Sequence, residues 1–355
     1  MKKEISRKNA ALDFMNALKE RRVNFNELKK ELGTVCSAKF GRSWEEFEKF
    51  LKENSSNFNV VDKMNMIFMQ NILAGKKRIW IYSLNEKTID EICRASNLLV
   101  AEKSIFTDSY PLPILHNKHE TVKPVLVDVI KEGKDFSLVF CSIRSYKDSV
   151  EYEYGELDNE VRMKFGDFDT LKTYKKVYFQ AYDIVNIRRS RNRIELLQDY
   201  PERSHGDDND EFPVKIWNSL SFHSKEIANI GKTEPENVFG AINEIYMNKK
   251  FGKILELKFR TLDGSIKHER MTKHKEDLRE EKFHEGGAQA VDNKIMPYEI
   301  SVVFEEGMQF NRKVDLSLTS SIKNLSGRRE LYCFEITSIS QLGQFEIINA
   351  LEGIL

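Results

Sequence analysis

The sequence predicts an α+β protein with an N-terminal helical bundle, a central antiparallel sheet or small barrel, and a C-terminal α+β segment. Apolar residues first recur at helical spacing, then form short alternating runs joined by brief turns, and finally mix both patterns. An acidic stretch rich in turn residues, PERSHGDDNDEFP, separates the last two regions. These changes predict a helical bundle at 1–75, a β-rich domain at 76–200, an acidic linker at 201–213 and an α+β domain at 214–355.

The first 75 residues are expected to form four or five short helices. Leu12, Met15 and Leu18 fall on one helical face, and Ser43 with Glu46 forms a capping box ahead of another apolar face. That second helix, SWEEFEKFLKE, carries four glutamates, which phosphates would repel if it read DNA. We therefore expect the bundle to dock a protein partner.

The central region is expected to be a meander of strands with short links. The apolar side chains of Val161, Met163 and Phe165 alternate with charged neighbours, as on a strand with one buried face. The expected strands are PVLVDVI, FSLVFCSIR, SVEYEY, EVRMKF and the two strands of a hairpin at 174–199.

The C-terminal region mixes helices with a second expected sheet. Asp263-Gly264 lies between two alternating runs, which is a strong hairpin signal. Helices are expected at 214–224, 235–248 and 342–351, and further strands at 298–304, 314–318 and 331–337.

Composition limits the classes of protein that this chain can belong to. The 355 residues include 56 basic and 56 acidic side chains, so a uniformly basic nucleic-acid binder is disfavoured while a local basic patch is still compatible. The four cysteines are far apart and form no CxxC pair, which argues against a disulfide framework or a zinc finger. The N-terminus does not resemble a signal peptide, and no apolar run approaches the ~20 residues of a membrane span. We expect a soluble cytoplasmic protein with no membrane contact and no cofactor.

The sharpest functional clue is a basic turn inside the hairpin at 174–199. Val177, Phe179 and Ala181 alternate with polar or aromatic neighbours, and Asn192 tolerates the left-handed backbone that short turns need. Guanidinium groups are planar forked donors that suit phosphate oxygens. The alternative is a solvated loop that pairs with the acidic stretch. The turn carries Arg188, Arg189, Arg191 and Arg193.

The leading hypothesis is a non-enzymatic protein that associates with nucleic acid, with DNA favoured, as part of a larger complex. Arginines and lysines would contact the phosphate backbone without reading sequence. Antiviral defence would be compatible with such a role, but no residue indicates it. The candidate contacts are Arg188, Arg189, Arg191, Arg193, Lys175, Lys176, Arg328 and Arg329.

Two other classes of function are compatible with the sequence. Glu256 and Lys258 are two apart on an expected strand, and so resemble the Glu-x-Lys half of restriction-type nuclease cores, whose acids hold a divalent metal. No Pro-Asp partner lies at a suitable distance, and alternating Glu and Lys is common on the wet face of a strand. The third hypothesis is a structural protein–protein adaptor.

Histidines and loop acids give weaker signals. His268, His274 and His284 lie near glutamates, but their spacing does not require them to converge, and His116 with His119 lacks further ligands. The aspartates of the acidic stretch do not have EF-hand spacing. We therefore expect hydrated loops and no metal site.

Overall fold

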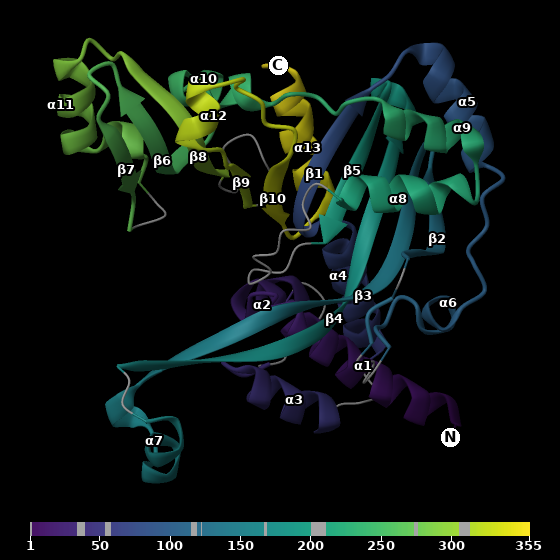
Figure 1. The fold of residues 1–355 in the computed structure, drawn as a ribbon. Coiled ribbons are helices and arrows are strands. Elements are labelled where there is room, and N and C mark those ends of the chain that lie inside the picture. Colours follow the sequence, from purple (N-terminus) through teal and green to yellow (C-terminus); the bar gives the residue numbers. More distant parts are fainter. Residues whose placement is uncertain are drawn as a thin grey trace.

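One ten-stranded antiparallel sheet organises the chain (Figure 1). The computed structural model describes residues 2–33, 40–53, 58–114, 119–121, 123–166, 169–199, 211–272, 276–304 and 313–355. The strand order is β2-β3-β4-β5-β1-β10-β9-β8-β6-β7. The strands are β1 (Gly75–Ser83), β2 (Val125–Glu132), β3 (Asp135–Glu153), β4 (Thr170–Arg188), β5 (Arg193–Asp199), β6 (Lys253–Thr261), β7 (Ile266–Arg270), β8 (Ile295–Phe304), β9 (Val314–Leu318) and β10 (Phe334–Ser338).

Strand β1 joins the two halves of this sheet. It pairs with β5 on one side and with β10 on the other. Ile79 and Ile81 point into one hydrophobic core, while Trp80 and Tyr82 point into a second core on the opposite face. The α+β class is therefore confirmed, whereas the expectation of a separate second sheet is wrong, because β1 uses one edge to pair with β5 and the other to pair with β10, which joins all the described strands into one sheet.

Helices cover both faces of the sheet. The larger core lies under α1 (Lys2–Glu20), α2 (Phe25–Gly33), α3 (Trp44–Glu53) and α4 (Phe58–Leu73), and it extends to α10 (Phe239–Met247) and α13 (Gln341–Glu352). The second core lies under α5 (Glu86–Ser96), α8 (Phe212–Ser221) and α9 (Lys225–Ala228). Shorter elements are α6 (Ile105–Ser109), α7 (Asn159–Phe165), α11 (Lys282–Ala290), α12 (Ile322–Ser326), and the 3₁₀ turns η1 (Tyr154–Glu156), η2 (Arg189–Arg191), η3 (Asn229–Lys232) and η4 (Leu278–Glu280).

Several local predictions are confirmed. The Ser43 hydroxyl accepts the Glu46 N–H at 3.3 Å, and the Glu46 carboxylate returns to the N–H of Arg42 at 2.7 Å. Gly264 adopts a φ of +91° in the turn between β6 and β7, as the Asp-Gly signal requires. The apolar face of α3 is turned inward through Phe47 and Leu51, and partner docking by the bundle stays a prediction.

One predicted strand is wrong. Residues 159–165 form the helix α7, which ends at Gly166 with a φ of +81°. The apolar side chains whose alternation suggested a buried strand face are exposed, with Met163 80% and Phe165 58% accessible. The alternation is thus not a core signal, since this segment packs on no described sheet face.

Two further expectations concern membrane spans and the acidic linker. No helix within the described ranges is both long and apolar enough to cross a membrane. Residues 201–210 of the acidic linker lie outside the described residues, and the division into four segments stays a prediction.

Candidate interaction surface

The basic turn forms the hairpin that the sequence predicts. Strands β4 and β5 pair from Ile184 opposite Leu197 to Arg188 opposite Arg193. The turn η2 closes the hairpin, and Asn192 adopts the left-handed conformation with φ 52° and ψ 41°. The predicted hairpin and the role of its asparagine are confirmed.

The two arginines that flank this turn are buried in the protein. Arg193 is fully buried; its Nε donates to Glu195 Oε1 at 2.7 Å, and its terminal nitrogens donate to Glu352 and Asn349 on α13, each at 2.7 Å. Arg188 is 5% exposed, lies over the ring of Phe345, and has Glu195 at 3.6 Å. Buried charges require such partners, so both residues attach the hairpin to α13.

The other two arginines of the turn are more accessible. Arg189 Nε pairs with Asp90 Oδ1 at 2.5 Å, while the side chain of Arg191 is exposed. The expectation that four guanidinium groups are exposed together is therefore wrong. The carboxylates that pair with them are Glu195, two residues beyond the turn on β5, and three that are distant in sequence: Asp90 on α5, Asp135 on β3 and Glu352 on α13.

The remaining candidate contacts do not extend one cationic track. Arg328 and Arg329 are exposed after α12, where Arg329 has a φ of +54° and donates to the carbonyl of Leu325. Lys175 and Lys176 lie on the distal part of β4, which projects from the opposite end of the sheet (Figure 1).

The nuclease candidates lie on one strand face, as predicted, but each already has a partner. Lys258 pairs with Glu299 at 2.7 Å, and Glu256 pairs with His268 at 2.6 Å. The hydrogen bond that Lys258 donates to Glu299 raises the pKa of Lys258, which keeps the amine protonated. In the part of the chain that the structure describes, no three His, Cys, Asp or Glu side chains converge as a metal site would require. The nuclease hypothesis stays a prediction.

The histidines near β7 do not converge either. His284 is buried between Glu269, 2.5 Å from its Nδ1, and the hydroxyl of Tyr246, 3.1 Å from its Nε2. His268 instead uses Glu256, and His274 lies outside the described residues. His284 is thus a satisfied core histidine.

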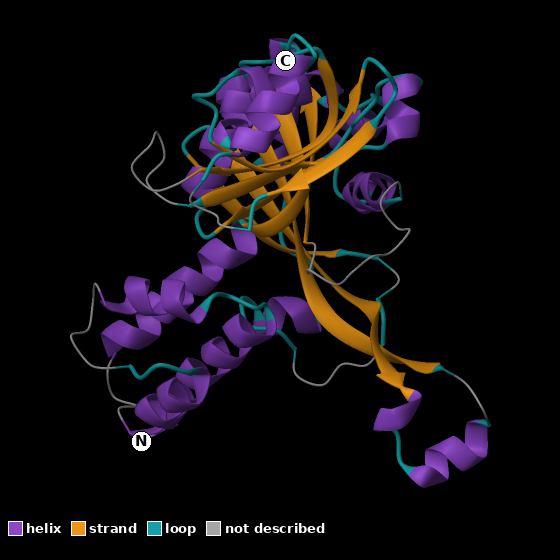
Figure 2. Ribbon diagram, turned by 90° about the vertical axis from the view of Figure 1, so that its left-hand side faces the viewer, coloured by secondary structure: helices purple, strands orange, loops and turns teal. Residues whose placement is uncertain are grey.

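The most prominent surface feature is a two-stranded extension of β3 and β4, which we call the ribbon (residues 144–153 and 170–179). In Figure 2 the ribbon leaves the body of the protein toward the lower right and carries α7 at its tip, while the N-terminal helices lie at the lower left. Its two strands stay paired out to Glu153 opposite Thr170. Pairing of β3 with β2 reaches only Cys141, and pairing of β4 with β5 begins at Ile184, so no described strand covers either edge of the ribbon.

The ribbon has two chemically different faces, because directly paired residues point to the same side. Among the apolar residues, Val150 is 49% exposed, and none of those on the distal rows packs against the two cores. One face, called the apolar face below, presents Tyr146, Val150, Tyr152, Leu171, Val177 and Phe179, and it also carries Arg144, Asp148, Lys175 and Thr173. The other face presents Lys147, Glu151, Glu153, Lys172, Tyr174 and Lys176.

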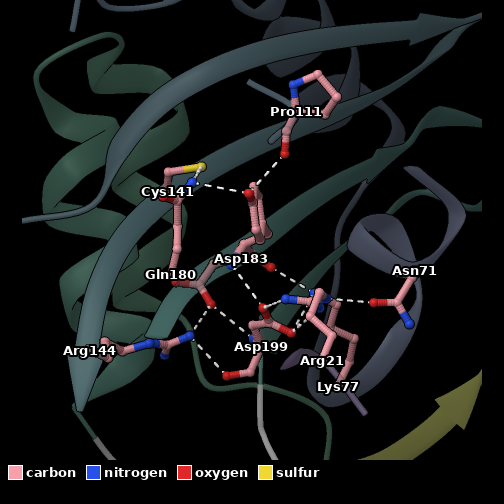
Figure 3. A network of polar contacts seen from close by, with 10 residues as sticks. Arg21, Asn71, Lys77, Pro111, Cys141, Arg144, Gln180, Asp183 and Asp199 are labelled. Atoms are coloured by element: carbon pink, nitrogen blue, oxygen red, sulfur yellow. Dashed lines mark hydrogen bonds and ion pairs between the residues drawn. The ribbon is translucent and has the colours of Figure 1, made fainter. Parts of the chain in front are cut away.

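A buried ionic network lies where the ribbon leaves the sheet (Figure 3). Asp199 accepts two hydrogen bonds from Arg21, at 2.7 and 2.9 Å, and one from Lys77 at 3.2 Å. Arg144, at the first row of the ribbon, donates to Asp183 at 2.8 Å and to the carbonyl of Asp199 at 2.9 Å. The network joins α1 and four neighbouring strands, and so it fixes the root of the ribbon.

The network changes the pKa values of its members. Burial alone would raise the pKa of Asp199, but the charges of Arg21 and Lys77 outweigh burial and hold it well below its usual range. Burial raises the pKa of Asp183, with Arg144 opposing it. Burial lowers the pKa of Lys77 to about 8, against the attraction of Asp199. Lys77 is completely buried, so this perturbed amine is inaccessible to a substrate and serves the structure.

The sequence contains a signal for this network that the periodicity of apolar residues does not reveal. Lys77, Asp183 and Asp199 are charged residues that lie next to or near buried apolar runs in β1, β4 and β5. A charge in a buried strand needs a partner on a neighbouring strand.

Comparison with known proteins identifies no similar protein, so a functional assignment depends on the geometry described above. No protein-family model, curated protein or solved structure matches the chain.

Proposed function

We propose that this protein is a binding protein that docks a protein partner through the apolar face and tip of the ribbon. The observation that carries the proposal is a projecting ribbon whose edges no described strand covers and whose distal apolar side chains pack against neither hydrophobic core. An isolated two-stranded hairpin is marginally stable in water. A partner that covered the apolar face would stabilise it by about 25 cal/mol for each Å² of apolar surface removed from water.

The charges of the ribbon favour a protein over a nucleic acid as the partner. Its root is basic, through Arg144, Lys147, Lys175 and Lys176, whereas its distal half is acidic. Phosphates would be repelled by this acidic half, while exposed methionine and aromatic side chains are typical of protein interfaces. The distal carboxylates are Glu151, Glu153, Glu156, Asp158, Glu160 and Asp169.

The position of the ribbon also suits a docking role. The buried network holds its root against α1, β1 and β5, so the two strands leave the sheet in a defined direction. A preorganised element loses less conformational entropy on binding than a disordered segment.

Nucleic-acid association is the second candidate. The observation that favours it is the group of lysines along the ribbon, Lys147, Lys175 and Lys176 near the root and Lys172 in the distal half, together with Tyr174, which is 64% exposed. In proteins that bind single-stranded nucleic acid, cationic side chains contact the phosphate backbone and exposed aromatic rings stack on the bases. Lys176 already pairs with Glu120 at 3.0 Å, which weakens this candidate.

Site-specific crosslinking tests the leading proposal. A photo-reactive phenylalanine analogue at position 150 should capture a protein in cells, whereas the same analogue at the exposed position 249 should not capture it. The captured protein is then purified, and its affinity is measured by calorimetry for the wild type and for two triple variants.

The two triple variants distinguish the faces of the ribbon. Val150→Ser with Leu171→Ser and Phe165→Ser should weaken binding at least tenfold, which corresponds to about 1.4 kcal/mol. The matched variant Glu151→Ser with Lys172→Ser and Tyr174→Ser should have a smaller effect. Equal crosslinking at positions 150 and 249, or unchanged affinity of the apolar variant, would refute the proposal. Salt-dependent DNA binding lost only in the second variant would favour nucleic acid instead.

A further inference from the structure

A cavity of about 300 Å³ lies where α2, α4 and the start of α13 meet. This junction is formed by residues from both ends of the chain, and it is separate from the apolar face of the ribbon. The cavity is within the size range of sites that bind small molecules. Its lining includes Leu28, Met66, Ile67 and Leu342 together with Glu27, Glu31, Gln70 and Glu346.

The apolar part of the cavity has a buried floor and an open mouth. Leu28 is 1% exposed and Ile67 is half-buried, so both can contact the body of a ligand. Met66 and Leu342 are 48% and 56% exposed, which is unusual for large apolar side chains. An apolar ligand would therefore remove further apolar surface from water.

One buried carboxylate oxygen in the polar part of the cavity lacks a hydrogen-bond donor within the described part of the chain. Glu346 Oε2 is buried, and no described residue donates a hydrogen bond to it. Burial raises the pKa of Glu27, against the nearby charge of Lys313. Glu31 pairs with Lys63 at 3.5 Å. An unsatisfied buried acceptor is unfavourable, and a donor on a ligand would satisfy it.

The other polar groups of the lining already have partners. Gln70 Oε1 accepts the N–H of Gln341 at 3.0 Å, and the Ser340 hydroxyl accepts the N–H of Gly343 at 3.2 Å. Asn71 Oδ1 accepts from Arg21 at 2.5 Å. The N–H groups of Gln341 and Gly343 at the start of α13 are thus engaged, and the carboxylates set a negative potential that disfavours an anion.

We propose that this cavity binds a small organic cation with an apolar body, such as an alkyl or aryl primary amine. The ammonium group would donate to Glu346 and lie near Glu27, and the apolar body would pack on Leu28 and Ile67. Charge-assisted hydrogen bonds of this kind are stronger than neutral ones. The proposal does not depend on the function of the ribbon.

Three six-carbon probes test the proposal; each has an alkyl chain, and they differ in the polar group at its end, which is positive, neutral or negative. Hexylamine, hexan-1-ol and hexanoate are titrated into the full chain, and the methyl signals of Met66 and Ile67 are followed by NMR. Hexylamine should bind at least tenfold more tightly than hexan-1-ol, and hexanoate should bind most weakly.

Variants separate the charge of the cavity from its apolar floor. Glu346→Gln should lower the affinity for hexylamine to that for hexan-1-ol and leave hexan-1-ol unaffected. Glu160→Gln, the same change on the remote helix α7, should alter neither affinity. Equal affinities for the three probes, an unchanged preference in Glu346→Gln, or no response to millimolar hexylamine would overturn the proposal.

Discussion

Asp199 is the residue on which the buried network converges. Three donors, from Arg21 and Lys77, point at its carboxylate, and the backbone N–H of Tyr182 adds a fourth at 2.9 Å. Each of these donors is left without its acceptor if the carboxylate is removed. Breaking a buried ion pair from one side is more costly than never forming it.

Acid should destabilise the protein through this residue. The folded-state pKa of Asp199 lies below its ordinary value of 3.8, so the unfolded state binds more protons as the pH falls. Its contribution to the free energy of unfolding is therefore fully present above about pH 4 and is lost progressively below it. We expect Asp199→Asn to be destabilised by roughly 3 kcal/mol at neutral pH and to lose less stability on acidification than the wild type.

Urea unfolding at several pH values measures this effect. Asp183 provides the control, because burial raises its pKa and its protonation in acid favours the folded state. Asp183→Asn should therefore steepen the loss of stability in acid, in the opposite direction to Asp199→Asn. An identical acid dependence in wild type and Asp199→Asn would show that other carboxylates dominate.

At the scale of elements, the hairpin between β4 and β5 depends on the backbone of its turn. Asn192 adopts a φ of +52°, a region that a β-branched residue enters only at a cost of about 1–2 kcal/mol. Asn192→Val should lower the free energy of unfolding by about that amount, whereas Asn192→Gly should be close to neutral. Thermal unfolding checks both, with Ser190→Ala in the same turn as a control; equal effects of valine and glycine would contradict this account.

Local patterns predicted most elements because these elements carry their own signals. The capping residues of α3, the Asp-Gly turn and the left-handed Asn192 depend on neighbours within a few residues. Segment 159–165 was predicted wrongly because alternation alone does not reveal whether a partner strand is present. The burial of Arg188 and Arg193 could not be predicted, since Phe345 and Glu352 approach them only through the fold.

At the scale of the whole molecule, the two halves of the sheet share one core. The larger hydrophobic cluster contains residues of the N-terminal helices together with residues of β10 and α13. Because β1 is the common strand, loss of either half leaves one of its edges unpaired. A division into separate domains at the predicted linker, 201–213, would require the opposite behaviour.

We therefore expect one cooperative unfolding transition. Trp44, Trp80 and Trp217 report on the bundle, on β1 and on the second core, so their fluorescence should follow the same curve as far-UV circular dichroism. Ile336→Ala in β10 should lower the free energy of unfolding by about 2–4 kcal/mol, and both measurements should give the same decrease. Two separate transitions would support the domain boundaries that the sequence suggests.

Because β1 pairs with β10, which lies near the end of the chain, the sheet can be completed only late in translation. Arg78 on β1 pairs with Glu335 on β10, and 257 positions separate them. A nascent chain emerging from the ribosome thus holds an apolar strand with one open edge until almost the entire polypeptide has been made. Such an edge recruits other strands, so chaperone supply during synthesis should govern the yield of native protein.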